Sequence, residues 1–164
     1  ESTVTCAGAK PSVTVQPFTV LGLAGVLFTA GFGALVLGPS CEKALKTADA
    51  LLCTVTDRLD IDATLACFEP DATFTIATFD TVYRGRDTGI RGMFERLNSR
   101  YSRVWHGNFD HIVQVPNRVA SQFRVENTML DGSLRVKNNC NFFSVRGTRF
   151  ESVQVYMSGD NSLA

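Results

Sequence analysis

The chain has 164 residues, of which 45% are hydrophobic and 20% are charged, with 16 basic and 16 acidic side chains. This length accommodates one membrane span and one ordinary domain. The neutral balance argues against nucleic acid as a partner, because neutralising phosphates requires a basic excess. The first residue is Glu1 rather than methionine, from which we expect a processed protein.

The amino-terminal part divides into an expected extended arm, residues 1–16, and a predicted transmembrane helix, residues 17–38. No charged residue occurs between Lys10 and Glu42. As a helix, residues 18–37 would reach about 30 Å, the thickness of the hydrocarbon core of a bilayer. A buried helix of a soluble protein, or an uncleaved signal sequence, is the alternative interpretation.

One face of the predicted span carries small residues at a spacing of four, which would let another backbone or a flat cofactor approach closely. This packing seam comprises Gly25, Phe28, Thr29, Phe32 and Gly33. The alternative is that glycine is simply common in membrane helices. Lys43 and Lys46 follow the span and only Lys10 precedes it, so the positive-inside tendency places the remaining domain on the cytoplasmic, stromal or matrix side.

Residues 39–164 are predicted to form one α+β domain that begins with two amphipathic helices. The first would be capped by Ser40 and end near Leu59, and the second would start at Asp60 or Asp62 and end before Pro70. The apolar face of the first helix consists of Leu45, Ala48, Leu52, Val55 and Leu59, and that of the second of Ile61, Leu65 and Phe68.

Two strands, residues 72–76 and 78–83, are expected next, followed by a third helix that Asp87 would cap. Its buried face would consist of Ile90, Met93, Phe94, Leu97 and Tyr101. Another face would carry Arg96, Arg100 and Arg103 as a basic docking face. Such a face is either solvated or in contact with anionic lipid or an acidic partner.

The rest of the chain predicts four strands, residues 105–115, 118–130, 133–145 and 149–157. Asp131-Gly132 is the strongest hairpin signal, and a two-residue loop there would place Glu126 opposite Lys137 on the outer face. The apolar residues expected on the inner face are Phe123, Val125, Met129, Leu134, Val136, Cys140 and Phe142. This order of elements predicts a curved antiparallel sheet wrapped around three helices.

Three short runs resemble a known family. They are LACFEPDATF at residues 65–74, YRGRD at 83–87 and IRGMF at 90–94. They resemble the SnoaL-like branch of the nuclear transport factor two-like superfamily, with a match over about residues 42–157. The resemblance implies a cone-shaped fold with a pocket. Its members include isomerases, cyclases and dehydratases that place acids, histidines or tyrosines at the base of an apolar cone.

Extending the hairpin register to the preceding strand predicts the polar residues of that pocket. Asp110, Asn127 and Asn138 fall on the inner face, and His106 shares the strand face of Asp110. Asp110 could then act as a general base beside amide donors. Alternatively, Asp110 lies in water at the rim, and the inward set consists of Phe109, Val113 and Val115.

No metal site is expected. His106 and His111 are five residues apart and should point to opposite faces of a strand. The sequence contains no nucleophile elbow, phosphate loop or Cys-x-x-Cys motif, so we expect no cofactor in the soluble domain, although pigment or lipid could contact the span. The five cysteines, Cys6, Cys41, Cys53, Cys67 and Cys140, are widely spaced, which favours reduced or buried thiols over a disulfide framework.

Two functions fit these features. The first is a non-catalytic accessory or assembly subunit of a membrane complex, photosynthetic such as a photosystem or else respiratory, whose partners are other subunits and lipid. The thylakoid is then favoured over the mitochondrial inner membrane for this single-pass protein. The second is a membrane-anchored isomerase, cyclase or dehydratase that uses the cone pocket on a hydrophobic small molecule.

Overall fold

The computed structural model describes residues 12–13, 46, 48, 56–114 and 117–164. Its helices are α2, Ile61–Ala66, and α3, Arg91–Arg100, with a 3-10 turn at Ala77–Phe79 and a π-helical turn at Gly85–Ile90. Its strands are β1 (Ser12–Val13), β2 (Phe68–Ile76), β3 (Thr81–Arg84), β4 (Tyr101–Gln114), β5 (Arg118–Met129), β6 (Leu134–Arg146) and β7 (Arg149–Met157).

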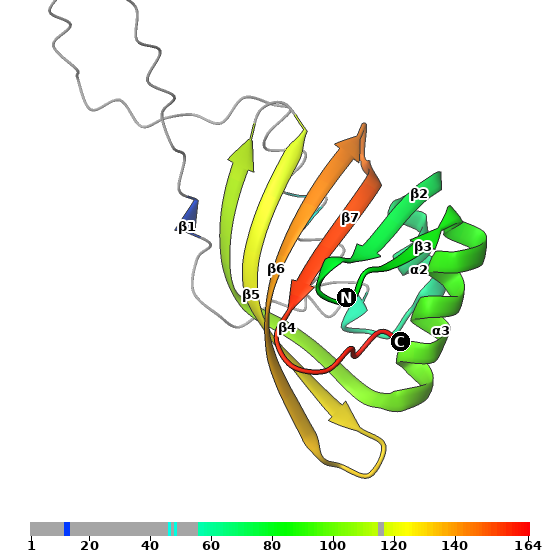
Figure 1. Cartoon of the computed structure of the whole chain (residues 1–164), viewed down its shortest axis with the longest axis vertical. Helices are drawn as coiled ribbons and strands as arrows, with labels where there is room; N and C mark the ends of the chain where they lie inside the picture. The colour runs from blue at the N-terminus through cyan, green and yellow to red at the C-terminus, as the bar shows by residue number, and fades with distance from the viewer. Residues whose placement is uncertain (1–11, 14–45, 47, 49–55, 115–116) are drawn as a thin grey trace, which may run out of the picture.

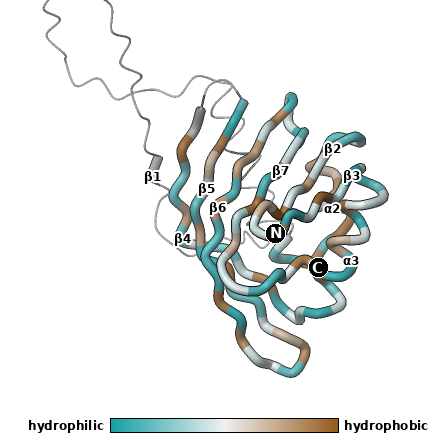
Figure 2. The backbone as a smooth tube through the Cα atoms, viewed as in Figure 1, coloured by the Kyte–Doolittle hydropathy of each residue, from teal (hydrophilic) through white to brown (hydrophobic). Residues whose placement is uncertain are grey.

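The strands form one curved sheet in the order β1-β4-β5-β6-β7-β2-β3, with α3 packed against its concave side (Figure 1). Neighbouring strands from β4 to β7 are antiparallel, whereas β7 pairs with β2, and β1 with β4, in parallel. The curved α+β architecture that the sequence predicts is therefore confirmed for the described residues. Hydrophobic and hydrophilic positions alternate along the strands, as Figure 2 shows, because successive side chains point to opposite faces.

A group of phenylalanines joins α3 to the sheet. The ring of Phe68 lies 6.4 Å from Phe74, 6.2 Å from Phe94 and 5.5 Å from Phe150, centroid to centroid. The predicted buried face of the third helix is confirmed, since Ile90, Met93, Phe94 and Leu97 are all buried. Tyr101 is buried as well, but it begins β4 instead of ending the helix.

The second helix is shorter than predicted. Asp60 is its N-cap, because the Asp60 carboxylate accepts a hydrogen bond from the backbone N–H of Ala63 at 2.9 Å. The helix ends at Ala66, so Phe68 belongs to β2, and Pro70 lies within that strand. A proline is tolerated there because the pairing of β2 with β7 shifts register between Phe68 and Thr73.

The β5–β6 hairpin has a register one residue away from the predicted one. Its loop holds three residues, Leu130 to Gly132: the N–H of Gly132 bonds the carbonyl of Met129, and the N–H of Met129 bonds the carbonyl of Ser133. Gly132 has a φ of 84°, as expected of a turn that ends in a left-handed residue.

This register changes the face of every β6 residue, because side chains alternate with a period of two. Glu126 pairs with Val136 and Lys137 with Val125, so the predicted Glu126–Lys137 pair is wrong. Leu134, Val136 and Phe142 are exposed on the outer face instead of filling the cone. The inner face of β6 carries Lys137, Asn139, Asn141 and Phe143 in their place.

A bulge in β4 overturns a second prediction. Two residues, Asn108 and Phe109, stand opposite Phe123, because Gly107 pairs with Arg124 and Asp110 with Gln122. Asn108 takes a φ of 56°. The extra residue shifts the alternation of side chains by one position in the second half of β4. His106 and His111 are therefore both buried, and Asp110 is exposed.

The predicted arm and transmembrane helix, with the packing seam of Gly25, Phe28, Thr29, Phe32 and Gly33, fall almost wholly outside the described residues. The same holds for most of the predicted helix that ends near Leu59; from that helix, Ala48 is described and fully buried. Among the helices that are described, none has both the length and the apolar character needed to cross a membrane.

Candidate functional site

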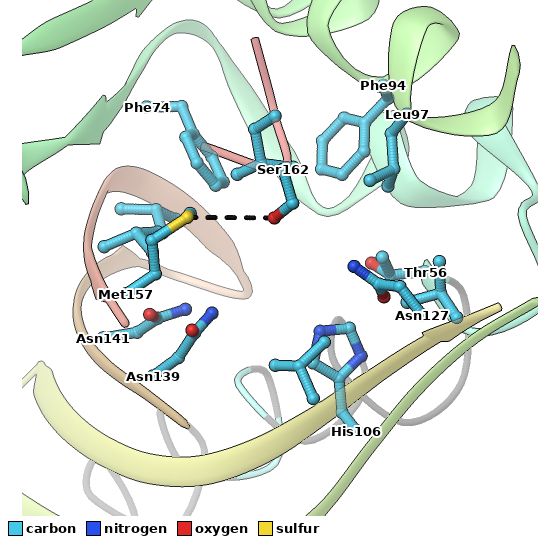
Figure 3. A pocket seen from close by; sticks show the side chains of 15 residues that line it. Thr56, Phe74, Phe94, Leu97, His106, Asn127, Asn139, Asn141, Met157 and Ser162 are labelled. Carbon is cyan, nitrogen blue, oxygen red and sulfur yellow. Dashed lines mark hydrogen bonds between the residues drawn. The ribbon is translucent and has the colours of Figure 1, made fainter. Parts of the chain in front are cut away.

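An apolar cavity lies between the concave face of the sheet, α3 and the carboxy-terminal segment, with about 530 Å³ of empty space including its open mouth (Figure 3). Its polar lining consists of Thr56, His106, Asn127, Asn139, Asn141 and Ser162. Its apolar lining consists of Phe74, Phe94, Leu97, Val104, Val125, Val153, Val155, Met157 and Leu163. A chamber with a few polar groups in an apolar wall is typical of a small-molecule site.

One residue of the lining, His106, is paired with the carboxylate of Asp57. Asp57 Oδ1 lies 2.5 Å from His106 Nδ1, and Asp57 Oδ2 accepts a 3.1 Å hydrogen bond from the backbone N–H of His106. The two side chains are only 10% and 15% exposed, His106 and Asp57 respectively. A carboxylate can only accept, so Nδ1 is the donor in this bond, and in a neutral imidazole the other ring nitrogen, Nε2, is then the acceptor.

Asp57 is held in place by a turn that precedes α2. The N–H of Leu59 bonds the carbonyl of Thr56 at 3.0 Å, and the side-chain amide of Asn98 on α3 donates to the carbonyl of Leu59 at 2.6 Å. Leu59 has a φ of 56°, so it terminates the turn in the left-handed region that a branched residue seldom adopts.

A residue in the left-handed region follows each member of the pair, and of the two only Leu59 is of a type that seldom adopts it. Leu59 lies two positions after Asp57, and Asn108 lies two positions after His106. These are two of the three described non-glycine residues with positive φ. Such conformations persist where the surrounding structure fixes them, and they cluster at functional sites.

Three asparagines supply the amide groups of the cavity, one from β5 and two from β6. Asn127 and Asn141 are 2% and 5% exposed. The Oδ1 atoms of Asn127, Asn139 and Asn141 are buried and accept no hydrogen bond within the described part of the chain. Figure 3 shows the amide nitrogens of Asn139 and Asn141 directed into the cavity.

The carboxy-terminal segment closes one side of the cavity, to which it contributes Ser162 and Leu163. Tyr83 donates its hydroxyl to the carbonyl of Leu163 at 3.1 Å, and the ammonium of Lys137 donates to the carbonyl of Asp160. Burial lowers the pKa of Lys137, which the nearby Asp160 carboxylate partly offsets. These contacts keep the segment against the mouth of the cone.

Two of the four pocket residues predicted from the sequence, His106 and Asn127, line the cavity. Asp110 and Asn138 do not, because both are exposed on the outer face. Asp57, Asn139 and Asn141 were missed. The two asparagines alternate along β6 and become recognisable only once the correct register is known, whereas Asp57 was expected within a long helix.

The predicted basic docking face is divided between two elements. Arg96 and Arg100 lie on α3, whereas Arg103 lies on β4. All three are exposed, and the guanidinium of Arg96 stacks 5.4 Å above the ring of Tyr83. The arrangement is not one helical face, because the helix ends at Arg100.

Within the described ranges, no group of three histidine, cysteine or carboxylate side chains could hold a metal ion. Cys67 and Cys140 are both free thiols there. Burial raises the pKa of each, so both favour the unreactive protonated form. The other three cysteines lie outside the described residues.

The protein is a small α+β domain in which a curved sheet surrounds an apolar cavity. A buried histidine–carboxylate pair lies at this cavity. The family model of the SnoaL-like domain matches residues 50–160, and the chain belongs to this family. No curated protein matches the chain in sequence.

Solved structures share the fold at low sequence identity. A candidate polyketide cyclase from Xanthomonas campestris pv. campestris is 20% identical, with 71% of this chain and 91% of that chain covered and a TM-score of 0.64. AusH from Aspergillus nidulans is 13% identical, with 76% and 89% covered and a TM-score of 0.65. A candidate isomerase from Bacillus subtilis is 12% identical, with 71% and 87% covered and a TM-score of 0.63.

Proposed function

We propose that this protein is a general acid–base enzyme of the isomerase, cyclase or dehydratase type that moves a proton on an apolar small molecule. The observation that carries the proposal is that His106 lines an apolar cavity and is bonded at Nδ1 to the carboxylate of Asp57. General bases need hydrogen-bond reach of the reacting proton and a fixed orientation, and Asp57 supplies the orientation. The names of the candidate cyclase and candidate isomerase with the same fold support this class.

The chemistry uses the two nitrogens of His106 differently. His106 Nε2 takes a proton from a substrate carbon, and the electron pair of the broken C–H bond moves into the adjacent carbonyl system as an enolate. The imidazolium that forms is stabilised by the Asp57 carboxylate at Nδ1. Return of the proton to another carbon isomerises the substrate. Attack of the enolate carbon on a second carbonyl of the same molecule instead closes a ring, and the alkoxide that forms takes the proton back from the imidazolium. Neither step requires another reactant.

The surrounding residues favour this chemistry. Most of the cavity lining is apolar, and electrostatic interactions are stronger in such surroundings than in water. The ring of Phe123 lies 5.4 Å from that of His106 in an edge-to-face arrangement and fixes the imidazole plane.

The proposal is tested with β-tetralone, an apolar bicyclic ketone with exchangeable α-protons. In heavy water the protein should accelerate deuterium incorporation at those positions, measured by proton NMR. Asp57→Asn should reduce the rate by as much as about 10⁴-fold, because the amide no longer selects the tautomer that leaves Nε2 free. Equal rates with the wild-type protein and with buffer alone would refute the proposal for this substrate type.

The accessory-subunit role, with a transmembrane anchor and a thylakoid location, remains a prediction from residues outside the described part of the chain. A membrane anchor is compatible with the enzymatic function, because an anchored domain can still carry an active cavity.

A further inference from the structure

The hairpin between β5 and β6 ends in an exposed apolar tip, residues 130–134, that the cavity does not explain. Leu130 and Leu134 are 70% and 54% exposed, the two largest exposed fractions among the large hydrophobic residues of the described ranges. Val136, which follows on β6, is also exposed. Figure 1 shows that this hairpin extends beyond the rest of the sheet. Exposed apolar groups of this kind mark surfaces that contact a protein or a membrane.

Hydrogen bonds hold the hairpin tip in a fixed turn. The backbone N–H of Met129 donates to the carbonyl of Ser133 at 2.8 Å, and the Asp131 carboxylate accepts from the backbone N–H of Ser133 at 2.9 Å. From β4, the hydroxyl of Ser102 donates to the carbonyl of Met129 at 3.2 Å. An apolar surface that is already ordered loses little conformational entropy when it binds.

Three arginines lie around the hairpin tip and form its basic border. Arg103 on β4 pairs with Thr128, which pairs with Leu134, so these side chains share the outer face. Arg100 ends α3 immediately before β4, and Arg135 follows Leu134 on β6. All three arginines are exposed, and none of the ion pairs between described residues involves them. The basic border therefore offers three positive charges to a partner.

The small size of the hairpin tip and the sign of its border favour a lipid surface over a protein. A stable protein interface buries roughly 800 Å² on each partner, more than a few side chains of one hairpin supply. Binding at a lipid interface instead combines a small inserted apolar surface with the attraction of basic residues to anionic headgroups.

We propose that the hairpin tip, through Leu130 and Leu134 and the basic border of Arg100, Arg103 and Arg135, docks the domain on a membrane that contains anionic lipid. The leucines enter the boundary between headgroups and acyl chains, and the guanidinium groups stay at the lipid phosphates. The inference rests neither on the acid–base function nor on the predicted span at residues 17–38. Such docking brings the domain to the phase in which apolar small molecules dissolve.

The test places a fluorescent reporter at the hairpin tip of the full chain. Leu130→Trp is made in a Trp105→Phe background, because Trp105 is the one tryptophan of the sequence. Vesicles of phosphatidylserine and phosphatidylcholine with brominated acyl chains should quench this reporter, since bromine acts only at short range. The readout reports the tip itself, whether or not another segment binds the vesicle. Phe142→Trp in the same background is the matched control, also on the outer face of β6, and should stay unquenched.

The charge of the basic border is tested in the same reporter protein. Replacing Arg100, Arg103 and Arg135 together by glutamine should raise the lipid concentration for half-maximal quenching by about 10²-fold, since each arginine near an anionic surface contributes about fivefold. Arg149→Gln removes an exposed arginine at the opposite end of β6 and should leave this concentration unchanged. Vesicles of phosphatidylcholine alone should quench as weakly as anionic vesicles do with the triple variant.

Circular dichroism first establishes that each variant is folded. If Trp105→Phe unfolds the protein, Trp105 is kept and the signal of the wild type is subtracted. An unquenched Leu130→Trp reporter, equal quenching of the Phe142→Trp reporter, or quenching that survives the triple arginine substitution would each overturn the proposal. A reporter emission that shifts with protein concentration but not with lipid would overturn it in favour of a second copy of the chain. None of these outcomes bears on deuterium exchange in the cavity.

Discussion

His106→Asn should slow deuterium incorporation into β-tetralone by about 10²- to 10⁴-fold, the usual contribution of a general base. The amide nitrogen of asparagine can take the position of His106 Nδ1 and keep a hydrogen bond to Asp57, so the fold should survive. The base at Nε2 is lost. Thermal unfolding, followed by circular dichroism, establishes that the variant is folded before its exchange rate is measured by NMR.

Asp110→Asn is the control for this experiment. Asp110 lies on the same strand as His106 but is exposed on the outer face, so its substitution should leave the exchange rate unchanged. Should the Asp110 variant lose the rate and the His106 variant keep it, the assignment of the base would have to be reversed.

Phe68→Ala should lower the free energy of unfolding by about 3–5 kcal/mol, as measured by urea denaturation. Phe68 is fully buried, and its ring contacts those of Phe74, Phe94 and Phe150, so its removal leaves a void between β2, β7 and α3. The effect should reach the site, because Phe74 and Phe94 also line the cavity.

Phe142→Ala is the matched substitution on the outer face. Its side chain is 40% exposed and contacts Tyr156 edge-to-face at 5.9 Å, so the loss should be about 1 kcal/mol. A similar loss in the two variants would mean that the core is not centred on Phe68.

The sequence was sufficient to predict the α+β class, the strands of the meander and the buried face of the third helix, because each depends on local periodicity and on turn residues. It also placed His106 and Asn127 among the candidate pocket residues, and both line the cavity. The family resemblance, on residues 65–74, 83–87 and 90–94, predicted the cone-shaped fold, which the match of the family model supports.

The errors came from single residues that change the register. Asp131-Gly132 is compatible with a two-residue or a three-residue loop. Because Leu130 is a third loop residue, the register shifts by one position and every side chain of β6 lies on the opposite face from the predicted one. The bulge at Asn108 and Phe109 does the same to the second half of β4. No pattern in the hydrophobic residues marks either insertion, and for this reason Asp110 was placed inside and Asn139 and Asn141 were missed.

Asp57 was missed for a different reason. The apolar spacing up to Leu59 predicts one continuous helix, in which Asp57 would be an ordinary polar position. The turn that ends in the positive φ of Leu59, fixed by the amide of Asn98, instead directs Asp57 toward β4. A contact between residues 49 positions apart in the chain depends on tertiary structure and has no local signal.

The most direct test of the account is nitrogen-15 NMR of the His106 imidazole at neutral pH, without and with β-tetralone. We expect the proton on Nδ1, bound to Asp57, an unprotonated Nε2, and a change in the Nε2 resonance when the ketone is added. A proton on Nε2 with a bare Nδ1, or an Nε2 resonance that the ketone leaves unaltered, would contradict the claim that His106 is the base of this cavity.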